Sequence, residues 1–407
     1  MNKALNILMI GHHRKYRNST RAHVIAKYLV RRGHKVTLLV TANERRFGLV
    51  ESEWDGVRII EAPDLLWGRL RSGWDPWDLA WRIGYLSKDE SPYDLVHCFE
   101  TRPTTIYAAL YYCHRHHKRF LTDWIDWVGR GGLITVNRPK WYGPLFGGIE
   151  TYYEEAFRAR AAGLTVIASA LAQRAIGLGV RPDRICHLPG GTMPDMFLPR
   201  SQVECRRKVG LPLEDPIIGY SSSDSHLDLE IVMAALAIIA REYPNVKLLM
   251  TGQVKKAVLD LAKAYEVERH LHLSGFLPFE ELPWYLGCAD LFVMPFPDTI
   301  YNRGRWPNKI GDYMSIGRPT ISNPYGDIKR VFEDFHVGLL ADCDPQDFAQ
   351  KIITVLENSS LATKLGKNAR RVAETEFSWE ELIRRLEAFY FQILGRTDLE
   401  DSSVAIN

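Results

Sequence analysis

Residues 293–323 read VMPFPDTIYNRGRWPNKIGDYMSIGRPTISN, and the assignment of the fold rests on this stretch. An apolar run stops at Pro295, and a polar loop leads to Pro307, where proline favours the first turn of a helix. The helix predicted over Asn308–Ile316 ends at Gly317, and a second apolar run follows. A strand, a helix and a strand in this order are typical of a parallel sheet with crossover helices.

The same alternation runs through the chain in two series. The first has strands predicted at Leu5–Ile10, Lys35–Thr41, Val57–Glu61, Leu95–Cys98, Arg119–Asp123, Leu164–Ala168 and Arg184–Leu188, with helices such as Ser19–Arg32 beginning at a Ser/Thr cap. The second has strands at Pro216–Tyr220, Val246–Thr251, His270–Ser274, Leu291–Met294, Thr320–Ser322 and Gly338–Leu340. We therefore predict an α/β fold of two doubly wound, Rossmann-like domains, with the active site in the cleft between them.

The domain limits follow from the distribution of prolines and glycines, which are densest in residues 189–213. We predict an N-terminal domain over residues 1–195 and a C-terminal domain over residues 205–379. A helix over residues 380–395 should complete the first domain, and the polar tail 396–407 should be disordered.

The composition indicates a folded protein, since 46% of the residues are apolar and 25% are charged. The longest apolar run, Ile231–Ala240, is too short to span a membrane, and the N-terminus lacks a signal-peptide pattern. We therefore expect a cytoplasmic protein. Its six scattered cysteines indicate reduced thiols better than a disulfide framework or a zinc site.

The charge is unevenly distributed along the chain. Residues 1–200 carry 29 Lys and Arg against 19 Asp and Glu, a balance of +10, and the remainder carries 23 against 30, a balance of −7. A basic half favours an anionic partner, either a phosphate-bearing ligand or an anionic lipid surface. We do not predict a nucleic-acid partner.

Lys309 and Asp312 are the candidate site residues of the predicted helix, because a spacing of three places both on one face near its N-terminus. At a positive helix end, a cation can bind a diphosphate and a carboxylate can bind ribose hydroxyls. A surface salt bridge between the two side chains is the alternative. Gly11, after the first strand, lets the backbone approach an anionic ligand, although no dinucleotide or P-loop motif surrounds it.

The stretch 293–323 resembles the donor-binding segment of GT-B glycosyltransferases, particularly family 4, the glycosyl transferases group 1. That family reads approximately Pro-x-Lys-x-x-Glu-Tyr-Met-Ala-x-Gly-x-Pro-Val at this point. The resemblance extends to GVRPDRICHLPGGTMPDMF at 179–197 and to LSGFLPFEELPWYLGCADLFVMP at 273–295. It implies transfer of a sugar, with retention, from a nucleotide diphosphate sugar to a glycan, lipid-linked or small-molecule acceptor. GT-B enzymes generally need neither a metal ion nor a cofactor.

The resemblance also implies roles for individual residues. Asp312 would hold the ribose, and Lys309, with Arg303 or Arg305, would neutralise the diphosphate. The Gly11 loop would contact a phosphate as well. The serine-rich loop that contains Ser221 and Ser222 can add hydroxyl and backbone donors.

Two departures from the family pattern favour a different interpretation. The first family acid falls on Gly304, with Asp298 the nearest carboxylate, and a family cation falls on Tyr220. A catalytically impaired GT-B protein that binds a nucleotide sugar or a glycan as a scaffold is therefore the alternative, although Lys309 and Asp312 oppose it. A nucleotide-sugar epimerase would need additional acids and a histidine that we do not locate in the sequence.

Asp123 and Asp126 follow a strand of the first domain, where the family often presents a histidine or an aspartate toward the transferred sugar. Either carboxylate could orient the acceptor or stabilise an oxocarbenium-like centre. A helix cap or a buried partner for Arg130 is the alternative.

The segment 67–81 carries four tryptophans and the cations Arg69 and Arg71. The helix it contains could be buried between elements. The alternative is peripheral insertion into an anionic membrane on its inner face, with Trp67 and Trp74 at the level of the headgroups.

Overall fold

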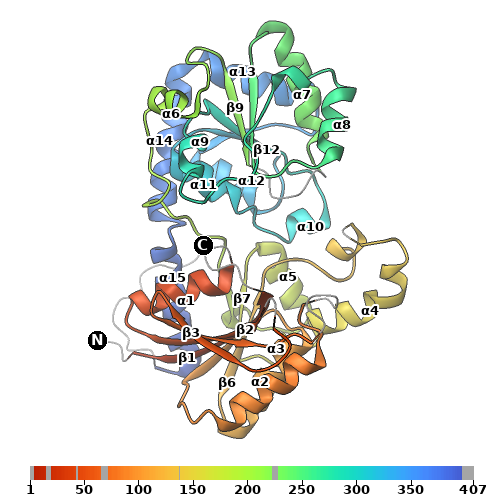
Figure 1. The fold of residues 1–407 in the computed structure, drawn as a ribbon, viewed down its shortest axis with the longest axis vertical. Helices are drawn as coiled ribbons and strands as arrows, with labels where there is room; N and C mark the ends of the chain where they lie inside the picture. Colours follow the sequence, from red (N-terminus) through yellow and green to blue (C-terminus); the bar gives the residue numbers. More distant parts are fainter. Residues whose placement is uncertain are drawn as a thin grey trace. The chain divides into compact units, whose positions relative to one another are not determined.

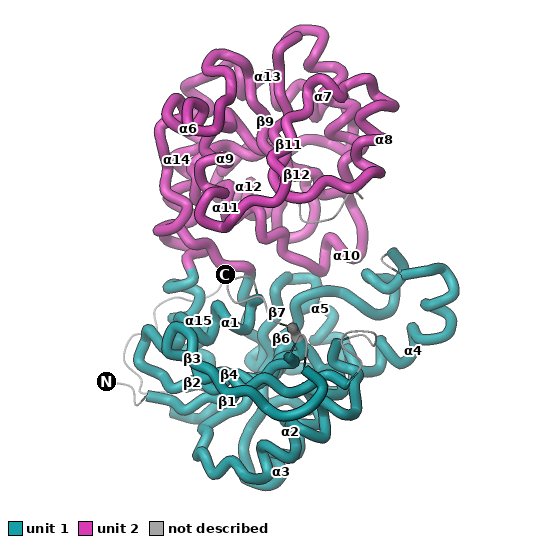
Figure 2. The backbone as a smooth tube through the Cα atoms, in the orientation of Figure 1, with its two compact units in different colours: residues 1–189, 379–407 teal, residues 190–378 magenta. Residues whose placement is uncertain are grey.

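The computed structural model describes residues 4–14, 20–42, 45–65, 72–136, 138–221 and 228–396. Figure 2 shows its two compact units, unit 1 with residues 1–189 and 379–407 and unit 2 with residues 190–378. The division between Pro189 and Gly190 lies in the predicted linker region and precedes the predicted limit at residue 195. Residues 397–407 of the predicted tail lie outside the described residues.

Unit 1 contains an eight-stranded sheet in the order β3-β4-β2-β1-β5-β6-β7-β8. Its strands are β1 (Asn6–Arg14), β2 (Lys35–Thr41), β3 (Val50–Trp54), β4 (Val57–Ala62), β5 (Leu95–Phe99), β6 (Arg119–Trp124), β7 (Gly163–Val166) and β8 (Ile185–His187). All neighbouring strands are parallel except β3 and β4. The hairpin strand β3 was not predicted, although the turn Asp55–Gly56 that joins it to β4 has positive φ angles at both residues, as a tight hairpin requires.

Helices lie on both faces of this sheet (Figure 1). They are α1 (Arg21–Arg31), α2 (Pro76–Lys88), α3 (Pro103–His116), α4 (Tyr142–Glu155), α5 (Ser169–Gly177) and α15 (Trp379–Leu394), with the short 3₁₀ turns η1 (Leu133–Thr135) and η2 (Pro182–Arg184). The predicted cap of α1 is only partly correct. Thr20 occupies the N-cap, but its hydroxyl contacts Nδ1 of His23 at 2.6 Å instead of a backbone N–H.

Unit 2 contains a six-stranded parallel sheet in the order β11-β10-β9-β12-β13-β14. Its strands are β9 (Ile217–Ser221), β10 (Lys247–Thr251), β11 (Leu271–Leu273), β12 (Leu291–Met294), β13 (Thr320–Ser322) and β14 (Gly338–Leu340). Its helices are α6 (Gln202–Val209), α7 (Glu230–Glu242), α8 (Lys256–Ala264), α9 (Leu282–Leu286), α10 (Ile300–Arg303), α11 (Lys309–Ile316), α12 (Gly326–Phe335), α13 (Pro345–Glu357) and α14 (Ser359–Thr375), with η3 at Glu268–His270. The predicted α/β class with two doubly wound sheets is confirmed.

The core of unit 2 positions the start of α11 against the end of β9. The ring of Tyr313 stacks on Phe292 with centroids 3.9 Å apart, and its hydroxyl oxygen accepts a hydrogen bond of 2.7 Å from the backbone N–H of Ser221. Gly219 makes the stack possible, because a Cβ there would lie 2.5 Å from the Phe292 ring. The carboxyl end of β9 and the second turn of α11 are thus held together.

Within the described residues, none of the helices combines the length and the apolarity that crossing a membrane requires.

Candidate active site

In unit 2 the strand order reverses between β9 and β12, and such reversals are where open α/β sheets bind ligands. Lys309 lies here, with its Nζ 4.1 Å from the centroid of the Tyr220 ring. Burial, aided by the nearby Arg305 guanidinium, lowers the pKa of Lys309 to about 7. Tyr220 occupies the position where the family carries a cation. Its ring is therefore in contact with a cation that α11 supplies.

Arg305 is the second cation of this cluster, and Asp228 is its counter-ion. Nη2 of Arg305 lies 3.4 Å from Oδ2 of Asp228, and the guanidinium packs over the Phe296 and Tyr301 rings. Burial raises the pKa of Asp228, while Arg305 and Lys309 act in the opposite direction. Two cations thus share one carboxylate, an arrangement that favours an additional anion such as a diphosphate.

Asp312 lies one turn further along α11 and is partly buried, and burial alone raises its pKa to about 7. It forms no hydrogen bond or ion pair with any other described residue, so the predicted alternative of a salt bridge to Lys309 is wrong. A buried carboxyl group with unused acceptors can bind ligand hydroxyls.

Arg303, the other predicted cation, is engaged elsewhere. Its guanidinium makes two hydrogen bonds of 2.6 Å to Asp298, and both side chains are exposed. Of the two candidate cations, Arg303 is therefore paired at the surface, whereas Arg305 lies in the cluster with Lys309 and Asp228. Asp298, the carboxylate nearest in sequence to the acid missing at Gly304, is engaged in the same ion pair.

Ser221 ends β9, and its hydroxyl oxygen lies 3.2 Å from Oγ1 of Thr251, which donates to it. Ser222, the other serine assigned to donor binding, lies outside the described residues.

In unit 1 the strand order reverses between β1 and β5. Gly11 was predicted to lie in a loop after the first strand, but it lies within a strand. β1 continues to Arg14, and Gly11 pairs with Phe99 of β5. Its carbonyl oxygen accepts a hydrogen bond of 2.9 Å from the buried Arg82, which also pairs with Asp78. The carbonyl oxygen of Gly11 is thus engaged by Arg82 within unit 1, and the approach of its backbone to a phosphate stays a prediction.

His12 of β1 and two residues that follow β5 form a polar cluster that the sequence did not reveal. Nε2 of His12 lies 2.9 Å from Oε2 of Glu100, and Nε of Arg102 lies 3.0 Å from the same oxygen. Glu100 has a φ of +66°, a conformation that is costly for a residue with a side chain and that occurs often at functional sites.

Asp126 lies beside this cluster. It lines two small cavities, and Glu100, Arg102 and Val128 line both of them. The larger cavity has a volume of about 140 Å³ and is also lined by Arg138. Two carboxylates and two guanidinium groups around one cavity can hold and polarise a hydroxyl-bearing ligand.

Asp123 does not line either of the two cavities that Asp126 lines, and its surroundings contradict its predicted catalytic role. The side chain is fully buried and pairs with Nε of Arg21 at 2.9 Å, and it accepts a hydrogen bond from Thr165. Arg21 also donates to the carbonyl oxygens of Leu188 and Pro189. Asp123 is therefore a buried partner, but of Arg21 and not of Arg130.

The tryptophan-rich segment also departs from expectation. The buried side chains of α2 include Asp78 and Arg82, while Trp77 and Trp81 are only partly buried. Trp74 packs edge to face on Tyr153, and its indole nitrogen is buried. Trp67, Arg69 and Arg71 lie outside the described residues. Nor do the described residues contain a group of three His, Cys, Asp or Glu side chains that could hold a metal ion.

Two family models match the chain, one for each unit. The model "Glycosyl transferases group 1" matches residues 201–372, and the model "Glycosyl transferase 4-like domain" matches residues 19–191. The chain belongs to the group 1 glycosyl transferases of GT-B fold.

Curated relatives in this family are distant. The spore coat protein SA of Bacillus subtilis is 24% identical over 208 residues, which cover 47% of this chain and 52% of that protein. The GDP-mannose-dependent monoacylated alpha-(1-6)-phosphatidylinositol monomannoside mannosyltransferase of Corynebacterium glutamicum is 22% identical over 210 residues, or 49% of this chain and 54% of that protein. The chain thus spans about half the length of the curated relatives it matches.

Solved structures of glycosyltransferases share the fold over nearly the whole chain. Sucrose-phosphate synthase from Thermosynechococcus elongatus has a TM-score of 0.75 at 17% identity, covering 96% of this chain and 100% of that one. HepE from Anabaena in complex with UDP-glucose has a TM-score of 0.70 at 14% identity, covering 95% and 100%.

Proposed function

We propose that this protein transfers a sugar from a nucleotide diphosphate sugar to a hydroxyl group of an acceptor, with retention at the anomeric carbon. The observation that carries the proposal is the cluster of Arg305 and Lys309 around Asp228, with the unpaired Asp312 one turn away. Since HepE of the same fold binds UDP-glucose, a donor of this class is the ligand we assign to unit 2.

The donor site would act mainly on the leaving group. In the transfer, the bond between the anomeric carbon and the diphosphate oxygen breaks, and the oxygen of the acceptor hydroxyl bonds to the same carbon. The hydroxyl proton passes to the leaving diphosphate, on which negative charge develops. Arg305 and Lys309 would stabilise that charge, and fixed cations are effective because they need little reorganisation during the reaction. The proposal invokes no metal ion or other cofactor, because these side chains supply the positive charge.

We assign the acceptor to unit 1, where Asp126 and Glu100 line the small polar cavity. A carboxylate there could orient the acceptor hydroxyl or stabilise a positively charged sugar ring. The acceptor would be a glycan or a lipid-linked sugar, and the name of the Corynebacterium relative provides a precedent for a lipid. We place the reaction in the cytoplasm, with peripheral membrane contact.

Binding should be tested before chemistry. Thermal unfolding is measured with UDP, GDP, ADP and their common sugars, and a ligand at 100 times its dissociation constant should stabilise the protein by about 2.7 kcal/mol. The donor that binds is then incubated with candidate acceptors, and nuclear magnetic resonance of the product gives the anomeric configuration. An inverted product would contradict retention, and the absence of binding by every nucleotide would overturn the proposal.

The second candidate function is a scaffold that binds a nucleotide sugar or glycan without transferring it. The glycine at position 304, where the family carries an acid, favours it. The same experiment separates the two functions, because a scaffold would bind a donor and release no free nucleoside diphosphate with any acceptor or with water.

A further inference from the structure

Helix α4 has the reverse of the usual amphipathic pattern. Its buried side chains, Glu150, Thr151 and Glu154, are polar. Its exposed side chains include large apolar ones, which we call the α4 face: Trp141 (58% exposed), Leu145 (70%), Phe146 (43%), Ile149 (46%) and Tyr152 (53%). Exposed apolar patches of this kind mark surfaces that contact a membrane or another molecule.

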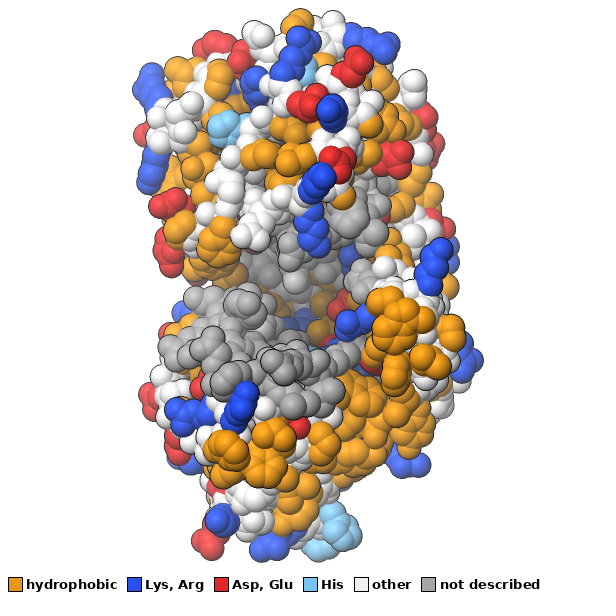
Figure 3. Space-filling model, turned by 45° about the vertical axis from the view of Figure 1, so that its right-hand side comes forward, with side chains coloured by type: hydrophobic (Ala, Val, Ile, Leu, Met, Phe, Trp, Pro, Cys, Tyr) orange, Lys and Arg blue, Asp and Glu red, His pale blue; other side chains and the backbone are white. Residues whose placement is uncertain are grey.

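The members of the α4 face form a continuous surface. Four of them follow one another at spacings of four, four and three residues, from position 141 to position 152, and therefore form one stripe along the helix. At about 1.5 Å per residue the stripe is about 17 Å long. Figure 3 shows hydrophobic side chains gathered on this side of unit 1, with Lys and Arg side chains beside them.

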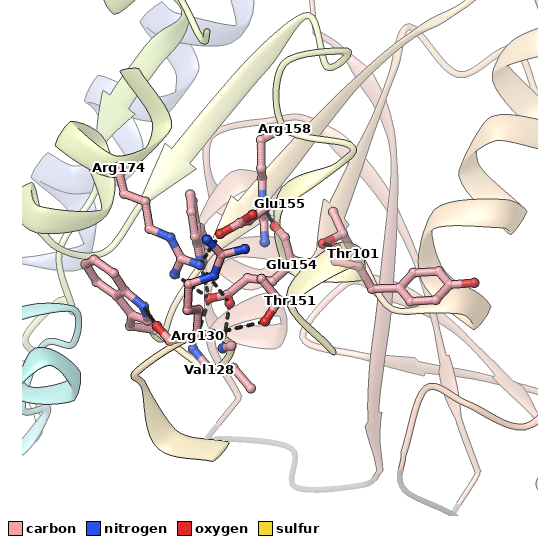
Figure 4. Close-up of polar contacts among 12 residues, drawn as sticks. Thr101, Val128, Arg130, Thr151, Glu154, Glu155, Arg158 and Arg174 are labelled. Atoms are coloured by element: carbon pink, nitrogen blue, oxygen red, sulfur yellow. Dashed lines mark hydrogen bonds and ion pairs between the residues drawn. The ribbon is translucent and has the colours of Figure 1, made fainter. Parts of the chain in front are cut away.

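The polar side of α4 is fixed inward by its hydrogen bonds. The carboxylate of Glu154 accepts from Nε1 of Trp124 at 2.9 Å and from the backbone N–H groups of Val128 at 2.9 Å and Gly129 at 2.6 Å, and it pairs with Arg174 at 3.2 Å (Figure 4). Rotating α4 to bury the apolar stripe would break these contacts and leave a buried carboxylate unpaired, which is strongly unfavourable. The outward position of the α4 face is thus part of the folded state.

The charges around the α4 face are suited to an anionic surface. Arg130, Arg138 and Lys140 are exposed and form no ion pair with any other described residue. Arg130 and Lys140 line a groove of about 760 Å³ together with residues of α4. The acids of α4 are engaged, because Glu150 and Glu154 are buried and Glu155 pairs with Arg174 at 2.5 Å. Apolar side chains with cations beside them are typical of helices that lie in a membrane interface.

We propose that the α4 face docks on an anionic lipid bilayer, with its apolar side chains among the headgroups and Arg130, Arg138 and Lys140 at the lipid phosphates. The surface differs from the segment 67–81 that the sequence indicated. Docking also has a consequence for the acceptor, and this consequence, unlike the docking itself, rests on the proposed function. Because Glu154 holds the backbone after Asp126, α4 would hold the Asp126 cavity close to a lipid-linked acceptor.

The test measures binding of the whole protein to vesicles by flotation. One set is phosphatidylcholine alone, and the other contains about 30% phosphatidylglycerol. The wild type should float with the anionic vesicles at low salt and less as salt is raised. Leu145→Ser should lower the partition coefficient about tenfold, since it removes a large apolar contact. The control is Phe276→Ser in unit 2, a side chain that is 80% exposed, and it should bind like the wild type.

A second pair of variants tests how much the cations contribute to vesicle binding. Lys140→Gln should lower binding to the anionic vesicles about fivefold, and Lys364→Gln, which removes an exposed cation of unit 2, should not. Thermal unfolding and nucleotide binding should be unchanged in all four variants, so a failure of docking is distinguishable from a failure of the donor site.

Three results would overturn the docking proposal. The wild type could stay unbound by anionic vesicles at low salt, or Leu145→Ser could bind them as well as the wild type. Light scattering could instead show a wild-type dimer that Leu145→Ser converts to a monomer, with no vesicle binding. In that case the α4 face would be an interface between two copies of the chain.

Discussion

When a nucleotide sugar binds, the protein should take up a proton from solution at pH 8 and release a proton at pH 6. The reason is that burial lowers the pKa of Lys309 to about 7 and raises the pKa of Asp312 to about 7. In the free protein, Lys309 is therefore charged in about 9% of molecules at pH 8 and about 91% at pH 6, and Asp312 is ionised in the opposite proportions.

The ligand should shift both groups toward their charged forms. A bound diphosphate favours the ammonium of Lys309 and raises its pKa toward the ordinary value, so at pH 8 Lys309 takes up about 0.9 proton while Asp312 releases about 0.1, a net uptake of about 0.8. Ribose hydroxyls that donate to Asp312 favour its carboxylate, so at pH 6 Asp312 releases about 0.9 proton while Lys309 takes up about 0.1, a net release of about 0.8. Since both charged forms together are most abundant at pH 7, the donor should bind about threefold more weakly at either pH than at pH 7.

Isothermal titration calorimetry in two buffers of different ionisation enthalpy measures this proton exchange directly. Lys309→Met should abolish the uptake at pH 8 and keep the release at pH 6, and Asp312→Asn should do the reverse. If the wild type binds the donor with the same enthalpy in both buffers at pH 6 and at pH 8, neither group contacts the ligand and our assignment of the donor site is refuted.

Three further predictions concern single side chains. Arg305→Ala should weaken donor binding about tenfold or more, since a charge-assisted contact contributes about 1.5 to 3 kcal/mol. Arg303→Ala should leave the affinity unchanged, because Arg303 pairs with Asp298. Equal effects of the two variants in calorimetry would contradict the assignment of Arg305. Asp126→Asn should lower the rate of sugar transfer at least about a hundredfold with donor affinity unchanged, because it removes a positioned charge; a wild-type rate would exclude Asp126 from the chemistry. Glu154→Gln should lower the free energy of unfolding by about 3 kcal/mol, as expected when one partner of a buried ion pair is lost. Denaturant unfolding measures this change, and a decrease of less than about 1 kcal/mol would show that the hydrogen bonds of Glu154 are not important for stability.

The strands and helices of unit 2 could be predicted closely because local signals coincide there with tertiary structure. Fully buried parallel strands read as short apolar runs, and the bounds of β12, β13 and β14 agree with the predicted ones. The start of α11 was found from Pro307 and its end from Gly317, which has a φ of +75°. The half-exposed strand β3 lacks such a run, and the Asp-Gly turn was the only local signal of the hairpin.

The candidate site was predicted less completely, because its chemistry depends on partners that are distant in the sequence. Asp123 pairs with Arg21, a residue 102 positions away, and no local pattern distinguishes it from Asp126. Asp228 acquires its role only through Arg305, 77 positions further on. The left-handed backbone of Glu100 is equally invisible in the sequence. The usual rule that apolar faces are buried also fails for α4, because the fold buries the glutamates instead.

Helix α15 constrains the order in which the chain can fold. It is the last helix of the described residues, yet it belongs to unit 1, where Tyr390 lies 2.7 Å from Nδ1 of His97 and Glu387 lies 2.8 Å from Nε2 of His34. During synthesis, residues 1–189 leave the ribosome before these partners exist, whereas unit 2 is continuous and can fold as soon as it emerges. Unit 1 can therefore be completed only after unit 2 has been made. For the same reason, an expression fragment that stops at residue 189 would expose the surface that α15 covers, while residues 190–378 form a natural fragment for binding studies.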